Sequence, residues 1–143
     1  MTLYLDTCVL LASLVPEVHT VAATAFLAGA DQVMAVSNWC ETELTSALGL
    51  KIRTNQLTAH QAEAVLFTYQ NDMAPALEQF PLEERDLLNA NGCLRGWSMA
   101  LRAADALHLA IAAGRGATLC SLDRVLVGAA WGLGFEAYLI PTA

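Results

Sequence analysis

Short apolar segments alternate with segments of helical character along almost the whole chain, and this alternation limits the fold more than any other feature. Strands are expected at residues 3–5, 33–36, 78–80, 117–120 and 135–140. Helices are expected at residues 7–14, 20–28, 38–52, 58–70, 83–95, 101–113 and 123–130. Strands separated by helices pair in parallel through right-handed crossovers, and the helices then cover both faces of the sheet. We therefore predict an α/β fold, a three-layer sandwich with a central parallel sheet of about five strands.

The composition fits one domain that spans residues 1–143. Apolar residues make up 56% of the 143 residues and charged residues 15%, which is ample for a buried core and excludes disorder. No apolar run is long enough to cross a bilayer, and the N-terminus lacks the basic region of a signal peptide. We expect a cytoplasmic protein with no membrane segment. The four cysteines, with no C-x-x-C pair, are interpreted as small buried hydrophobes rather than as zinc ligands or disulfides.

Three acidic residues follow predicted strands. Asp6 ends the first strand, Glu43 lies in the helix after the second, and Asp123 follows the strand at 117–120. Ligands bind at the carboxyl ends of the strands in sheets of this kind, so these side chains are expected at one edge. Asp6 and Asp123 each have an alternative interpretation as the N-cap of the helix that follows.

Asp105 lies in the middle of an apolar helix. Burying an unpaired carboxylate costs several kcal/mol, roughly, unless a partner compensates its charge. Arg102, three residues earlier, is one possible partner, and a bound divalent cation is a better one. His108 is interpreted as a satisfied core histidine rather than as a general base.

Glu41 and Glu43 compete for the remaining acidic position. Residues two apart on a helix point roughly 200° away from each other, so only one of the two can face the site. Periodicity does not decide between them. Clustered carboxylates would raise one another's pKa values unless cations were bound, and their hard oxygens suit Mg²⁺ or Mn²⁺.

The order of these acids resembles the PIN-domain family, and within it the VapC-type toxins of toxin–antitoxin pairs. The resemblance is carried by four short motifs: Tyr4-Leu5-Asp6-Thr7, Ser37 followed six residues later by Glu43, Ala104-Asp105-Ala106-Leu107-His108, and Leu119-Cys120-Ser121-Leu122-Asp123. The second motif, in which a serine precedes the glutamate by six, favours Glu43 over Glu41.

The resemblance implies an endoribonuclease that cleaves RNA with Mg²⁺ or Mn²⁺. Its implied metal ligands are Asp6, Glu43, Asp105 and Asp123, with Thr7 and Ser121 as supporting groups. It also implies a homodimer and inhibition by a VapB-like antitoxin with a basic segment, which would suit the net charge of −7.

The same charge disfavours RNA binding, because 14 acids face only 7 bases. The candidates for a phosphate-binding patch are Arg85, Arg95, Arg102, Arg115 and Arg124, besides Lys51 and Arg53. Two other functions stay open: an RNA-processing PIN nuclease without an antitoxin, and a PIN-like module that binds protein or RNA without cutting it. A P-loop NTPase is excluded because the chain has no G-x-x-x-x-G-K.

Overall fold

In the part of the chain that the structure describes, five parallel strands form a single sheet at the centre of the protein. A computed structural model describes residues 1–97 and 99–142. The strands are β1 (Thr2–Leu5), β2 (Val33–Ser37), β3 (Glu78–Phe80), β4 (Thr118–Ser121) and β5 (Ala137–Leu139). Their order across the sheet is β3-β2-β1-β4-β5, and every neighbouring pair is parallel. The predicted α/β fold with about five parallel strands is confirmed.

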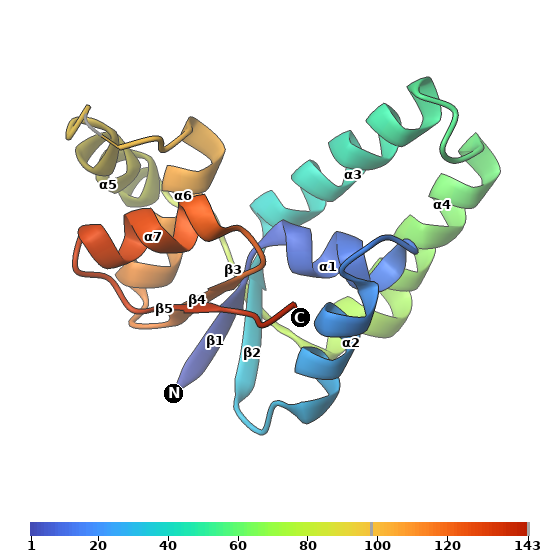
Figure 1. Ribbon diagram of the computed structural model, residues 1–143, viewed down its shortest axis with the longest axis horizontal. Helices are drawn as coiled ribbons and strands as arrows, with labels where there is room; N and C mark the ends of the chain where they lie inside the picture. Colours follow the sequence, from blue (N-terminus) through green and yellow to red (C-terminus); the bar gives the residue numbers. More distant parts are fainter. Residues whose placement is uncertain (98, 143) are drawn as a thin grey trace.

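Within the described ranges, seven α-helices cover the sheet. They are α1 (Thr7–Leu14), α2 (Thr20–Gly29), α3 (Asn38–Arg53), α4 (Ala59–Thr68), α5 (Glu84–Leu94), α6 (Ala103–Gly114) and α7 (Arg124–Gly132). Figure 1 shows α5, α6 and α7 on one side of the sheet and the first four helices on the other, which makes the predicted three layers. The chain moves from β1 outward to β3 and then returns to β4 beside β1, so the direction of winding reverses between β1 and β4.

Several element boundaries differ from the sequence prediction. The helix expected from residue 101 begins at Ala103, because Arg102 has the extended backbone of an N-cap, with φ −92° and ψ 164°. The helix expected to end at residue 70 is α4, which passes into a π-helical turn, η1 (Tyr69–Met73), and a 3₁₀ turn, η2 (Ala74–Ala76). Pro75 in η2 has no backbone N–H to continue an α-helical ladder. The last strand, β5, covers only Ala137–Leu139, which is shorter than the strand expected at residues 135–140.

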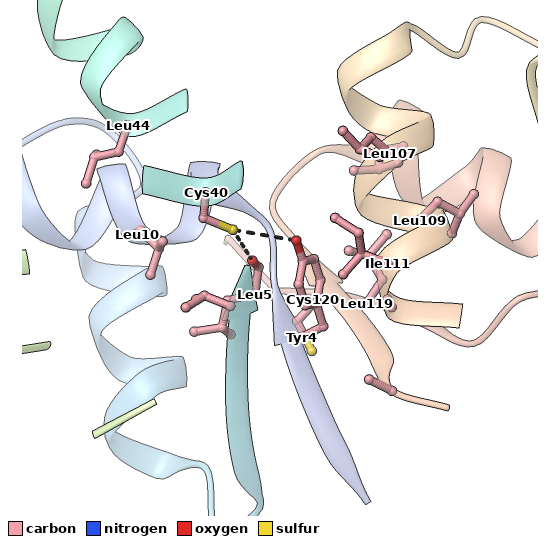
Figure 2. Packing of buried hydrophobic residues seen from close by; sticks show 14 of the residues in the cluster. Tyr4, Leu5, Leu10, Cys40, Leu44, Leu107, Leu109, Ile111, Leu119 and Cys120 are labelled. Carbon is pink, nitrogen blue, oxygen red and sulfur yellow. Dashed lines mark hydrogen bonds between the residues drawn. The ribbon is translucent and has the colours of Figure 1, made fainter. Parts of the chain in front are cut away.

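The core lies on both faces of β1. Figure 2 shows Leu10 and Leu44 packed on one side of this strand and Leu109 and Ile111 on the other. Tyr4, in the middle of β1, is fully buried, and its hydroxyl reaches toward α3. The central strand is therefore buried on both faces, and it positions the residue that follows β1.

Two of the four cysteines match the prediction of buried positions and two do not. Cys40 and Cys120 are buried, whereas Cys8 and Cys93 are partly exposed, and all four are free thiols. Among the residues that the structure describes, no helix combines the length and the apolar character needed to cross a membrane.

Candidate active site

A cluster of polar side chains lies at the carboxyl ends of β1 and β4, where the direction of winding reverses. Asp6 directly follows β1, and Ser121 is the last residue of β4. The Ser121 hydroxyl donates to Asp6 Oδ2 at 2.7 Å and accepts the backbone N–H of Asp123 at 2.9 Å. One serine thus joins the two strand ends and orients both acids. This is the edge at which ligands bind in doubly wound sheets.

Asp6 does not cap the helix that follows it. It occupies the N-cap position of α1 with an extended backbone, but its carboxylate makes no capping hydrogen bond. Instead, Oδ2 accepts from Ser121 and from the Cys8 thiol at 3.1 Å. The N-cap alternative for this buried aspartate is therefore wrong, because its carboxylate bonds to the Ser121 and Cys8 side chains instead.

Glu43, rather than Glu41, reaches this cluster from α3. The Thr7 hydroxyl donates to Glu43 Oε1 at 2.7 Å, and the same oxygen pairs with His108 Nε2. Burial alone would raise the pKa of Glu43, but these two partners outweigh burial and hold the pKa below its ordinary value. Glu41 points elsewhere and lines a shallow hollow with Tyr69 and other residues of η1 and β3.

His108, on α6, takes part in this cluster, which sequence reasoning missed. It is a satisfied core histidine as predicted, because its side chain is 1% exposed and Nδ1 lies 2.8 Å from the Tyr4 hydroxyl. Its other nitrogen, however, faces the acids, with Asp6 Oδ1 at 3.6 Å. Burial opposes protonation of His108, but Cys40 and Glu43 beside it, with the charge of Asp6, raise its pKa well above the usual range.

The sequence did contain one signal for His108. The residue is three positions after Asp105 on the same helix, so both side chains lie on one face. In the described part of the chain, one ligand atom from each of Asp6, Glu43 and His108 lies within 4.8 Å of the other two. That arrangement could hold a single cation.

Asp105 lies beside the same cluster, in the first turn of α6. Burial raises its pKa, and the negative charges of Asp6 and Asp123 raise it further. Arg102 does approach, as the sequence suggested, with Nε 3.7 Å from Asp105 Oδ2. The Arg102 side chain is 85% exposed, however, so this ion pair is weak and does not reverse the shift. The protein itself leaves the charge of Asp105 incompletely balanced.

Asp123 has a structural role as well as its place in the cluster. It is the N-cap of α7, where Oδ1 accepts the backbone N–H groups of Val125 and Leu126 at 2.9 and 3.3 Å. The N-cap interpretation is thus confirmed. It does not remove Asp123 from the site, because the charge of this residue acts on Asp105.

Comparisons with solved structures reveal proteins of the same fold. FitAcB from Neisseria gonorrhoeae superposes with a TM-score of 0.76 at 18% identity, covering 95% of this chain and 96% of that chain. VapC20 from Mycobacterium tuberculosis, a Sarcin-Ricin loop cleaving toxin, gives 0.72 at 16% identity, covering 97% and 99%. VapBC2 from Rickettsia felis, bound to a DNA fragment from its promoter, gives 0.71 at 14% identity, covering 99% and 100%. No curated protein matches the sequence significantly.

The fold and the acidic cluster define a class: a parallel α/β domain with carboxylates at the point where its winding reverses. The sequence matches the PIN domain family over residues 3–131, which is nearly the whole chain. This chain belongs to the PIN-domain family, as its four motifs predicted.

Proposed function

We propose that this protein is a metal-dependent endoribonuclease and the toxin of a VapBC-like toxin–antitoxin pair. The observation that carries the proposal is that Asp6 and Glu43 meet at one edge of the sheet, with Asp105 and Asp123 near enough for their charges to act there. A protein gains no stability from gathering carboxylates that repel one another, so their convergence calls for a cation.

The residues present fit a divalent cation. Burial and the charges of Asp6 and Asp123 raise the pKa of Asp105, and carboxylate oxygens are the ligands that Mg²⁺ and Mn²⁺ prefer. We assign the metal to these four acids. Once bound, such an ion activates a water molecule and stabilises charge on the scissile phosphate.

Thr7 and Ser121 are assigned as positioning residues. Each hydroxyl donates one short hydrogen bond to a carboxylate, Thr7 to Glu43 and Ser121 to Asp6, and each is buried. These bonds restrict the rotation of the acids and hold one oxygen of each in place. Groups of this kind around a metal site typically change metal affinity or activity by about 10–100-fold.

RNA is the proposed substrate, and a VapB-like antitoxin is the proposed partner. The similarity to VapC20, a Sarcin-Ricin loop cleaving toxin, supports RNA as the substrate. The similarity to FitAcB and VapBC2 supports the antitoxin as the partner. The net charge of −7 favours an antitoxin with a basic segment that binds at the acidic cluster. We further propose a homodimer and a cytoplasmic location.

The matched variants Glu43→Gln and Glu41→Gln test the nuclease proposal. Both remove one carboxylate from α3, but only Glu43 faces the cluster. With Mn²⁺ or Mg²⁺ and a defined RNA pool, we expect Glu43→Gln to cut more than about 100-fold more slowly than the wild type, since even an outer-shell change costs about 10–100-fold. Glu41→Gln is expected to cut within about 3-fold of the wild type.

A chelator should abolish cutting by the wild type, and added metal should restore it. Equal cutting by the wild type and Glu43→Gln, purified identically, would identify a contaminating nuclease and contradict the proposal. Absence of cutting together with absence of metal binding would instead indicate a non-catalytic binding module.

Two exposed arginines beside the cluster are expected to contact the RNA backbone. Arg102 is the N-cap of α6, next to Asp105 in space, and Arg124 is the first residue of α7, next to Asp123 in sequence. In the inactive Glu43→Gln background, replacing both arginines with alanine should lower the salt dependence of RNA binding. Each lost phosphate contact reduces the slope of log K against log salt by about 0.7 for a single strand.

Titration of RNA binding at several salt concentrations measures this slope. Arg53→Ala, a change at the far end of α3, serves as the control. An unchanged slope in the double variant would show that the RNA backbone does not contact these two arginines.

A further inference from the structure

We propose that His108 is a metal ligand, and that its nitrogen makes the site prefer a transition-metal dication over Mg²⁺. This inference rests on the proposed function only in assuming that a cation binds at the acidic cluster. It adds an imidazole to the four acids and thereby names the kind of ion that the site selects.

The positions of three atoms carry the proposal. His108 Nε2 lies 3.6 Å from Asp6 Oδ1 and also pairs with Glu43 Oε1, so the imidazole stands between the two acids. One ligand atom from each of the three residues lies within 4.8 Å of the other two. Two ligands of one octahedral ion, each about 2.1 Å from the metal, are separated by about 3 Å when adjacent and about 4 Å when opposite. The three side chains are therefore close enough to share one ion once the pair between His108 and Glu43 opens.

A hydrogen bond on the other side of the ring fixes His108 in this orientation. Nδ1 lies 2.8 Å from the Tyr4 hydroxyl, which in turn lies 2.8 Å from Ser37 Oγ. Tyr4 is on the central strand and is fully buried, so this support cannot shift easily. When the neutral ring donates Nδ1–H to an oxygen, Nε2 keeps a free electron pair for a metal, as in most histidine-ligated sites.

The nitrogen changes which ion the site prefers. Mg²⁺ binds oxygen almost exclusively and loses its water reluctantly, whereas imidazole nitrogen suits transition metals. With a buried nitrogen at one position, Mn²⁺ and the later divalent ions of its series gain an interaction that Mg²⁺ largely lacks. Without an ion, Nε2 and Glu43 share one proton in this pair, and a cation that takes both atoms as ligands would displace that proton.

Electron spin echo spectroscopy of the Mn²⁺-loaded protein tests the proposal directly. A coordinated imidazole produces ¹⁴N modulation of the Mn²⁺ signal, and we expect this modulation in the wild type. Protein labelled with [¹⁵N]histidine should lose the ¹⁴N pattern, which requires no variant and no activity. His60→Asn, a change at an exposed histidine on α4, should keep the modulation, whereas His108→Asn should lose it.

Calorimetric titrations with Mn²⁺ and with Mg²⁺ give the second readout. We expect His108→Asn to weaken Mn²⁺ binding by more than about 10-fold while Mg²⁺ binding changes by less than about 3-fold. Tyr4→Phe retains the ring nitrogen, so it should keep the modulation but weaken Mn²⁺ binding by about 10–100-fold, the usual effect of removing a partner behind a ligand.

Mn²⁺ that binds without ¹⁴N modulation would overturn the assignment of His108 and leave the nuclease proposal intact, with the histidine only positioning Glu43. A wild type that binds neither ion would contradict both proposals. If His108→Asn proves unfolded by circular dichroism, the labelled wild type alone decides the question.

Discussion

The Asp105→Asn protein is expected to cut RNA more than about 100-fold more slowly than the wild type, yet to melt at a higher temperature when no metal is present. The loss of cutting follows from the proposed role of Asp105 as a ligand. The gain in stability follows from its surroundings, because burial and the charges of Asp6 and Asp123 disfavour an ionised carboxylate at this position. Asparagine has nearly the same shape and no charge.

The pH dependence of this stability difference has a definite sign. The pKa of Asp105 is raised in the folded protein, so the folded state holds its proton more tightly than the unfolded state does. Raising the pH from the ordinary aspartate value of about 3.9 through the raised pKa therefore destabilises the wild type. The asparagine variant lacks this loss. The difference in stability between the two proteins should reach its full size at neutral pH. It should vanish below the ordinary pKa of aspartate.

Thermal unfolding with chelator, at a series of pH values, measures this difference, and Asp31→Asn is a suitable control. Asp31 is exposed in the turn before β2, so its replacement should leave the melting temperature and the rate of cutting unchanged. Added Mn²⁺ should stabilise the wild type more than the Asp105→Asn protein, since a ligand stabilises only the state that binds it. A metal-free variant that melts below the wild type would mean that Asp105 supports the fold.

Much of this site could be predicted from the sequence, because two of its acids follow predicted strands. Alternation of strands and helices predicts a parallel sheet, and such a sheet brings Asp6 and Asp123 to one edge. The choice of Glu43 over Glu41 could not come from periodicity, because both faces of α3 carry apolar residues. Only the resemblance to PIN domains decided it, and the structure agrees, with Thr7 bonded to Glu43.

The contacts that were missed all join residues far apart in the sequence. His108 looked like an ordinary core histidine because its support, Tyr4, is 104 residues away. Arg115 was a candidate for the phosphate-binding patch, yet its side chain is only 11% exposed and binds Asp86, 29 residues earlier. A local pattern predicts which face of a helix is buried, but it does not show which distant polar group completes a buried pair.

That buried pair is the basis of the second large prediction. Asp86 is completely buried at the start of α5, and both of its oxygens accept from Arg115, at 2.6 and 3.0 Å. Asp86 also accepts the backbone N–H of Glu83, and the Arg115 guanidinium donates to the Pro81 carbonyl and lies over the Phe80 ring. One ion pair thus connects α5, the end of α6 and the end of β3.

Asp86→Ala is expected to lower the free energy of unfolding by roughly 3–5 kcal/mol, because it leaves the Arg115 charge largely buried without its nearest partner, with Glu83 at 3.9 Å as the remaining acid. A domain of this size has a total stability of about 5–15 kcal/mol, so the variant should be marginally folded. Glu84→Ala is the matched control. Glu84 is exposed in the same helical turn, and its loss should cost no more than about 0.5 kcal/mol. Urea unfolding of the three proteins at neutral pH measures both effects.

Acidification should reduce the difference in the free energy of unfolding between the wild type and Asp86→Ala. Burial alone would raise the pKa of Asp86, but the Arg115 guanidinium and the Glu83 N–H outweigh burial and lower it. A lowered pKa contributes stability at neutral pH that is lost as the pH falls below the ordinary aspartate value of about 3.9 and through the folded value. The variant has no such contribution to lose. A difference that stays constant down to the acid transition would mean that Asp86 acts by its packing, and that the charge of the pair contributes little to the stability of the α5–α6 layer.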